Sequence, residues 1–153
     1  MKTKPSQKAV NIVCFIIFII YISVVLKLTI FRSGVYSERR LNLSLFTALI
    51  KIYRNAGLWR FLRLFLGNVG CFVPFGFLLP ILYKKANFVK VAALSFLFSF
   101  GIETTQYFSR KGIAELDDLI LNVFGAVVGY LLYKLLCRII RRRGRDDLRS
   151  SAH

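Results

Sequence analysis

Long apolar segments separated by short polar ones dominate this sequence. Four segments are long enough to cross the hydrocarbon core of a bilayer, which is about 30 Å thick and needs about 20 helical residues. They cover residues 9–26, 61–83, 89–108 and 117–137. None alternates as a barrel strand does, and lipid offers no partner to an unpaired backbone group, so each is expected to be helical. The pattern predicts an all-α integral membrane protein, a bundle of four transmembrane helices.

The first loop, about residues 32–60, is too polar to span a membrane but is patterned as a helix. Its apolar side consists of Phe46, Leu49, Ile50 and Tyr53. Its polar side consists of Thr47, Lys51, Arg54 and Asn55. This spacing predicts a short amphipathic helix that lies in the membrane interface. Its basic face suits either ordinary lipid phosphates or an anionic envelope ligand.

Composition changes this picture only in where the charges lie. The 153 residues include 23 Lys and Arg against 7 Asp and Glu, a net charge of +16, although 56% of the residues are hydrophobic. That apolar fraction excludes a disordered chain and argues against a soluble nucleic-acid-binding domain, the class that a strongly basic chain first suggests. The basic residues gather in the ends, the first loop and the turns. The expected partner is therefore membrane lipid, and not nucleic acid.

The chain divides into a basic N-terminus (residues 1–8), a transmembrane domain (9–137) and a basic tail (138–153). No small-residue cleavage site follows the first span, so this span is expected to be a retained anchor rather than a signal peptide. Lysines before the first span and arginines after the last favour cytoplasmic termini, although the basic first loop favours the reverse. We expect a multi-pass protein of the cell membrane with both termini in the cytoplasm.

Polar side chains of the last three spans fall on one side of the membrane, opposite the termini. Successive spans run in opposite directions, so the start of the second, the end of the third and the start of the fourth lie together. These places hold Arg63, Asn68, Glu103, Gln106, Arg110, Asp117, Asp118 and Asn122. A charge at the centre of a membrane helix costs about 2.5–3.5 kcal/mol, so these residues indicate a binding or catalytic site. A buried polar clamp that holds the bundle together is the alternative interpretation.

Helical phase predicts that two of these groups face each other. The third span carries a stripe with spacings of four, three and four, formed by Ser99, Glu103, Gln106 and Arg110. The fourth span repeats this spacing with Asp118, Asn122, Gly125 and Gly129. Residues at such spacings share one face of a helix. Facing stripes would bring carboxylate, amide and guanidinium groups within pairing reach.

Small residues predict where helices approach each other closely. Gly125 and Gly129 form a GxxxG pattern, which permits close backbone contact between membrane helices. Gly67, Gly70 and Pro74 are expected to thin one face of the second span in the same way. The GxxxG pattern serves packing within one chain as well as dimerisation, so it leaves the oligomeric state open.

The sequence offers few groups for catalysis or metal binding. Its single histidine is His153, so neither a Ser–His–Asp triad nor a histidine-rich metal site is present. Three cysteines within apolar spans form neither a disulfide framework nor a zinc motif. The carboxylates of Glu103, Asp117 and Asp118 suit a hard cation, but their spacing does not require one. We expect no metal and no cofactor, and Glu103 and Asp118 are the catalytic candidates.

Three motifs in order along the chain carry a resemblance to a known family. They are Leu41-Asn42-Leu43-Ser44-Leu45-Phe46, then Gly67-Asn68 with Phe72-Val73-Pro74-Phe75-Gly76, then Glu103-Thr104-Thr105-Gln106 with Arg110, Asp118, Asn122, Gly125 and Gly129. This set, over residues 41–136, resembles the signature of the VanZ-like family, except that Leu45 stands where the family usually has Pro. The resemblance implies a bacterial multi-pass membrane protein, related to a factor that gives low-level resistance to the lipoglycopeptide teicoplanin.

Two functions of different classes follow. In the first, a non-enzymatic factor binds an envelope lipid or the drug and reduces drug accumulation at the cell surface. The candidate binding residues are Asn42, Arg63, Asn68, Glu103, Gln106, Arg110, Asp118 and Asn122. In the second, an enzyme acts on a lipid-linked phosphate or glycan, with Glu103 or Asp118 as acid or base and arginines on the phosphate. The sequence favours the first, because a base without a nucleophile or metal partner is a thin basis for an enzyme.

Overall fold

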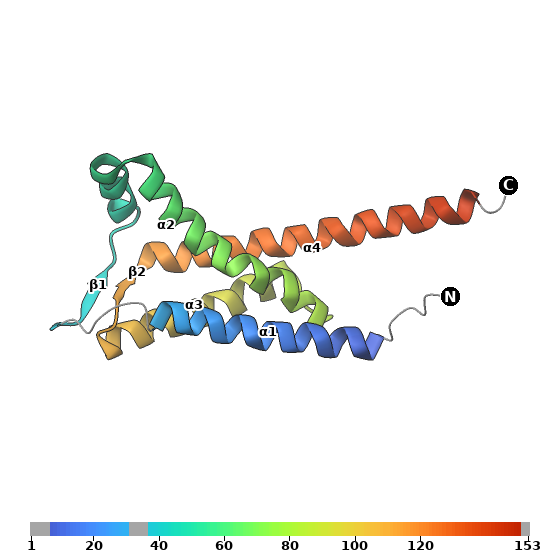
Figure 1. Ribbon diagram of the computed structural model, residues 1–153, viewed down its shortest axis with the longest axis horizontal. Coiled ribbons are helices and arrows are strands. Elements are labelled where there is room, and N and C mark those ends of the chain that lie inside the picture. Colours follow the sequence, from blue (N-terminus) through green and yellow to red (C-terminus); the bar gives the residue numbers. More distant parts are fainter. Residues whose placement is uncertain (1–6, 31–36, 151–153) are drawn as a thin grey trace.

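The computed structural model describes residues 7–30 and 37–150, with the side chains of all but residues 7, 30, 47–49, 51, 52, 144 and 146–150. Within these residues the chain forms four helices and two short strands (Figure 1). The helices are α1 (Gln7–Ile30), α2 (Thr47–Leu82), α3 (Phe88–Ser109) and α4 (Leu116–Ser150). All four are long and apolar enough to cross a membrane. The predicted all-α bundle of four transmembrane helices is confirmed. Residues 1–6 of the predicted basic N-terminus and 151–153 of the tail lie outside the described residues.

Helix α2 consists of two parts joined at Gly57. The backbone there has φ 80° and ψ 170°, which is not helical, and a positive φ of this kind favours glycine because it has no Cβ. The part before Gly57, residues 47–56, is the amphipathic helix expected in the first loop and is called the interfacial helix below. The part after it provides the second span. Figure 1 shows the interfacial helix turned away from the rest of α2.

The two ends of the molecule differ in what they carry. The start of α1 and the end of α4 lie at one end, which we call the terminal end, and the strands and the interfacial helix lie at the other, the polar end (Figure 1). Helix α3 begins at the terminal end after Asn87, whose side-chain oxygen accepts a hydrogen bond of 2.9 Å from the backbone N–H of Lys90. This is a standard N-cap. The helix ends at the polar end at Arg110, which has a left-handed φ of 56°.

Two three-residue strands at the polar end join loops that are far apart in the sequence. Strand β1 (Arg40–Asn42) runs parallel to β2 (Ile113–Glu115). The ladder pairs Arg40 with Ile113, Leu41 with Ala114 and Asn42 with Glu115. Such short strands carry no period-two pattern that a sequence reading can detect. The ladder therefore ties the first loop to the turn between α3 and α4 in a way that the sequence did not predict.

Helices α2 and α4 cross at the centre of the bundle with almost no space between their backbones. A Cβ added at Gly125 would lie 2.1 Å from the carbonyl oxygen of Val69, and one at Gly129 would lie 2.0 Å from that of Val73. On α2, a Cβ at Gly76 would lie 1.7 Å from the carbonyl oxygen of Ala126. The GxxxG residues of α4 thus lie directly against α2, as small residues do between membrane helices.

The expected small face of the second span is different from the one observed. A Cβ added at Gly67 or Gly70 would meet no atom within 4 Å. The face of α2 that contacts α4 follows Val69, Val73 and Gly76, at i, i+4 and i+7. Gly67 and Gly70 are out of phase with it, so the expectation that they thin the packing face is wrong, and Gly76 takes that role. Pro74 lies inside the helix and is half-buried.

The apolar core lies among all four helices. It includes Val25, Phe72, Phe75, Val91 and Ala126. The rings of Phe72 and Phe75 pack at centroid distances of 5.7 and 5.6 Å from the ring of Phe98. Helix α1 is fastened to α2 by the hydroxyl of Tyr21, which donates a 2.6 Å hydrogen bond to the carbonyl of Cys71. These apolar contacts fill the centre of the bundle, and the polar side chains of the spans lie at the polar end.

Candidate functional site at the polar end

The two polar stripes meet inside the bundle at Ser99 and Asn122. The side-chain amide of Asn122 donates a 2.9 Å hydrogen bond to the hydroxyl oxygen of Ser99. Asn122 is 7% exposed and Ser99 is 0% exposed. Burial of polar groups is costly unless they are hydrogen-bonded. This contact gives the buried Asn122 amide and the buried Ser99 hydroxyl a partner where α3 and α4 pack together. It marks the inner limit of the polar region.

Glu103 lies one turn further along α3 and binds the strand pair. Its carboxylate oxygen Oε2 accepts a 2.9 Å hydrogen bond from the backbone N–H of Glu115 in β2, and its side chain is 7% exposed. In the ladder Glu115 is paired with Asn42. The side-chain oxygen of Asn42 in turn accepts a hydrogen bond of 3.1 Å from the backbone N–H of Ser44. Glu103 thus holds the strands against α3.

The two acids at the start of α4 hold α2. Asp118 accepts a hydrogen bond from the side-chain amide of Asn68. Asp117 is 1% exposed, and its Oδ1 accepts a 2.7 Å hydrogen bond from the backbone N–H of Phe46, where the interfacial helix begins. Among the described groups its Oδ2 is buried without a hydrogen-bond partner. Acids in the first turn also complement the positive end of the helix dipole.

Three of the sequence-predicted residues point away from this group. The amide of Gln106 donates a 2.9 Å hydrogen bond to the carbonyl of Thr29, at the end of α1. Arg110 is exposed and donates to the carbonyl of Ser37 at 3.4 Å. Arg63 is also exposed and lines a surface pocket of about 560 Å³ beside Trp59. The structure therefore brings Glu103, Asp118, Asn122, Asn68 and Asn42 to one end but directs both guanidinium groups elsewhere.

An apolar pocket lies beside Glu103, and sequence reasoning missed it. The pocket has a volume of about 270 Å³ and lies between α3 and the two strands. It is lined by Leu41, Phe100, Glu103, Thr104, Tyr107, Phe108 and Ala114. The residues from α3 recur every three or four positions, a signal that was present but that looks the same as an ordinary lipid-facing stripe. The strand residues complete the pocket only because β1 and β2 pair.

A cation lies next to the aromatic wall of this pocket. The guanidinium carbon of Arg39 is 5.7 Å from the ring centre of Tyr107 and 5.3 Å from that of Phe108. Both distances are within the range of a cation–π contact. Phe100 and Phe108 are 54% and 62% exposed, so the pocket is open to the surroundings of the bundle. An apolar cavity with a neighbouring guanidinium suits a ligand that has both an apolar chain and an anionic group.

A bundle of four spans with hydrogen-bonded polar groups and an open apolar pocket at one end defines a small multi-pass membrane protein with a candidate ligand site. The family model described as VanZ/LLP1 matches residues 18–138. This chain therefore belongs to the VanZ/LLP1 family, and the membership that its motifs predicted is confirmed.

The chain is also similar to Protein VanZ of Enterococcus faecium. The two are 32% identical over 100 residues, which is 65% of this chain and 56% of that protein. The chain thus spans little more than half the length of the curated relative that it matches. No solved structure matches it. All of the polar-end residues described above lie within the part that the family model covers.

Proposed function

We propose that this chain is a membrane factor that lowers accumulation of the lipoglycopeptide teicoplanin at the cell surface, by binding an envelope lipid or the drug at its polar end. Membership of the VanZ/LLP1 family and similarity to Protein VanZ support the resistance role. The observation that carries the binding mechanism is the open apolar pocket beside Glu103 with Arg39 at its wall.

The pocket suits one part of an amphiphile. Its volume of about 270 Å³ is close to the lower end of the roughly 300–1,000 Å³ usual for small-molecule sites. Its walls are mainly aromatic and aliphatic, so an acyl segment is the fitting occupant. The guanidinium of Arg39 lies beside the aromatic wall and is placed to bind a phosphate or carboxylate of the same molecule. Envelope lipids and acylated drugs share this combination.

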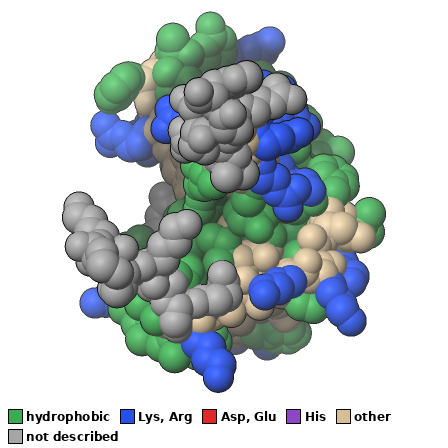
Figure 2. Space-filling model, turned by 90° about the vertical axis from the view of Figure 1, so that its right-hand side faces the viewer, with side chains coloured by type: hydrophobic (Ala, Val, Ile, Leu, Met, Phe, Trp, Pro, Cys, Tyr) green, Lys and Arg blue, Asp and Glu red, His purple; other side chains and the backbone are tan. Residues whose placement is uncertain are grey.

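The proposal places both termini in the cytoplasm and the polar end on the outer face. Lys84 and Lys85 lie in the turn between α2 and α3, and Lys90 lies in the first turn of α3, all at the terminal end. Figure 2 views this end and shows Lys and Arg with no Asp or Glu among the described side chains in view. Positive charge gathers in cytoplasmic loops. Arg39, Arg40 and others at the polar end weaken this asymmetry.

The orientation has a direct test. A reporter enzyme that is active only in the cytoplasm, fused after residue 153, should be active, and one that is active only outside should be silent. The reverse pair of results would place the pocket at the inner face and would contradict binding of a drug from outside.

No observation favours the enzymatic alternative. The carboxylate of Glu103 accepts a hydrogen bond from a backbone amide, and that of Asp118 accepts one from Asn68. Arg63 and Arg110, which that hypothesis assigns to phosphate, are exposed; Arg63 lines the pocket beside Trp59, and Arg110 donates to the carbonyl of Ser37. The arrangement fits groups that hold the polar end together, which leaves the pocket as the place where a ligand can bind.

The proposed function is tested by surface labelling. Cells that express the chain should bind less fluorescent teicoplanin than cells with an empty vector. Thr104 lines the pocket, so Thr104→Trp should fill it and restore labelling to the vector level at unchanged protein abundance.

Thr105→Trp is the matched control for this experiment. Thr105 is the next residue on α3, is exposed and does not line the pocket, so its variant should keep labelling low. Equal labelling of expressing and empty-vector cells would contradict the resistance role. Low labelling in both tryptophan variants would retain that role but remove the pocket from it.

A further inference from the structure

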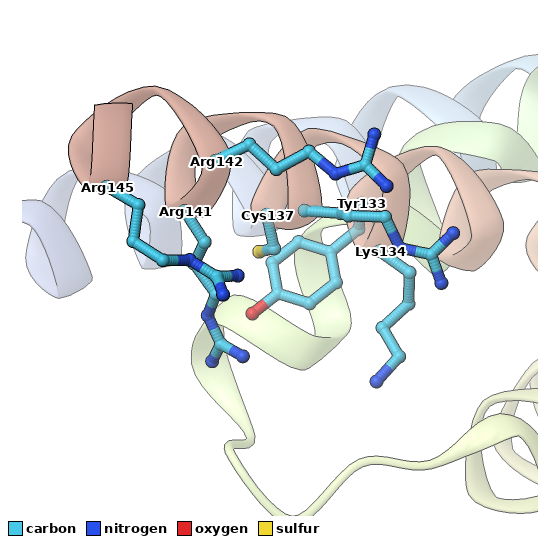
Figure 3. Close-up of a pocket in the computed structure, with 7 residues that line it drawn as sticks. Tyr133, Lys134, Cys137, Arg141, Arg142 and Arg145 are labelled. Atoms are coloured by element: carbon cyan, nitrogen blue, oxygen red, sulfur yellow. The ribbon is translucent and has the colours of Figure 1, made fainter. Parts of the chain in front are cut away.

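The terminal end of α4 carries a further pocket that the proposed function does not use. Its volume is about 460 Å³ and seven residues line it. Five of them are cations: Lys134, Arg138, Arg141, Arg142 and Arg145. Tyr133 and Cys137 complete the lining. Figure 3 shows the Tyr133 hydroxyl directed toward the side of α4 on which the guanidinium groups of Arg141 and Arg145 lie. No acidic side chain is among the lining residues.

The positive charge of this segment is only partly compensated. Between residues 134 and 147 the sequence holds six cations against two acids, Asp146 and Asp147. Guanidinium groups form paired hydrogen bonds with phosphate oxygens, and several together create a strongly positive local potential. The group that a ligand of this pocket should carry is therefore a phosphate, whether in a lipid headgroup or as the free ion.

The position of the pocket relative to the membrane favours a lipid over free phosphate as its ligand. A span of about 20 residues from Asp117 ends near residue 137, so Tyr133 lies where aromatic side chains meet the headgroups and the arginines lie just beyond. The same face also exposes apolar side chains nearer the bilayer centre, since Leu131 and Leu135 are 55% and 51% exposed. At 100° per residue, Leu131 falls between Arg138 and Arg142 around the helix, and Leu135 falls beside Arg142. Headgroup and acyl chains of one lipid would both find partners on this segment.

We propose that the terminal end of α4 binds the headgroup of an anionic phospholipid in the adjacent leaflet. Phosphodiester oxygens accept hydrogen bonds from the guanidinium groups of Arg138, Arg141 and Arg145, and the Tyr133 hydroxyl donates another. The acyl chains lie along Leu131 and Leu135. Positions 138 and 145 are about 10.5 Å apart along the helix axis at 1.5 Å per residue. That length accommodates two phosphates, so a lipid with two phosphodiester groups binds more tightly than a lipid with one.

The test uses the purified full chain in a neutral detergent, with bound lipid counted by native mass spectrometry. The protein is titrated with diphosphatidylglycerol, phosphatidylglycerol and phosphatidylcholine, and the expected affinities fall in that order. Arg141→Gln should weaken diphosphatidylglycerol binding about fivefold, the contribution of one basic residue near an anionic surface. Arg143→Gln is the matched control, because Arg143 has the same charge on the same helix but does not line the pocket. It should change the affinity less than twofold.

Three results would overturn this site. Equal weakening by Arg141→Gln and Arg143→Gln would mean attraction by net charge alone. Displacement of the lipid by excess inorganic phosphate would mean a free-phosphate site. Equal binding of phosphatidylcholine would mean that the headgroup charge is not recognised. Gel filtration of each variant verifies that it is folded. Since the assay contains no drug and concerns the opposite end of the bundle, its failure and the failure of the proposed function are distinguishable.

Discussion

Replacing Gly129 with alanine is expected to lower the thermal unfolding temperature by about 5–10 °C and to reduce the amount of protein in the membrane. The new Cβ would lie 2.0 Å from the carbonyl oxygen of Val73 and 2.9 Å from the backbone nitrogen of Phe77. Both are backbone atoms of α2, so no side chain can move aside and the helices must separate. Overpacking costs about 1–3 kcal/mol or more, which corresponds to several degrees for a chain of this size.

Gly70→Ala provides the matched control for this prediction. It makes the same chemical change in the same membrane bundle, but its Cβ meets nothing within 4 Å. Alanine also favours helix over glycine by about 1 kcal/mol. This variant should therefore unfold at an unchanged or higher temperature. Both temperatures are measured on detergent-purified protein by the loss of the monodisperse gel-filtration peak on heating. Equal stability of the two variants would contradict the close contact of α2 and α4.

Glu103→Ala is expected to abolish protection against teicoplanin labelling, whereas Glu103→Gln should keep it. Alanine removes the hydrogen bond between the Glu103 carboxylate and the backbone N–H of Glu115, and a hydrogen bond to a charged group contributes about 1.5–3 kcal/mol. The strand pair that completes the pocket would then loosen. Glutamine keeps an oxygen at the same position, so the hydrogen bond, the strands and the pocket should survive. Labelling with fluorescent teicoplanin is measured together with the amount of protein in the membrane.

This pair of variants also decides between the two interpretations of the polar residues. If Glu103 acts by holding β2, the glutamine variant behaves as the natural protein. If its carboxylate binds a ligand or transfers a proton, Glu103→Gln loses protection at normal abundance. The second outcome would contradict the supporting role assigned here and would return Glu103 to the candidate catalytic residues.

The spans and their shared polar side were predictable because both depend on local composition. A segment of apolar residues long enough for the bilayer must be a helix, and alternation of direction then places the polar residues of three spans at one end. The family motifs followed the same segments. The interfacial helix was predictable from a single amphipathic turn pattern, and Gly57 supplied the break that separates it from the second span.

The partners of the polar residues were not predictable, because several partners satisfy the same helical phase. Gln106 and Glu103 belong to one stripe, yet Gln106 bonds to α1 and Glu103 to β2. Helical phase states which residues share a face but not which neighbour that face meets at each level. Arg110 illustrates this, because it lies just after the end of α3 and its guanidinium donates a hydrogen bond to the carbonyl of Ser37 in the first loop.

The sequence by itself determined that this chain is a four-span membrane protein, on which side its polar residues gather and that Gly125 and Gly129 belong to a packing face. Only the tertiary structure decided that Gly76, rather than Gly67 or Gly70, lies against α4, where it meets the backbone of Ala126. It also decided that β1 pairs with β2, and that Asp117 holds the backbone of Phe46, 71 positions away. The physical reason is that burial in lipid is a property of each segment alone. Backbone hydrogen bonds between distant loops, and the pocket that they enclose, exist only after the helices have packed.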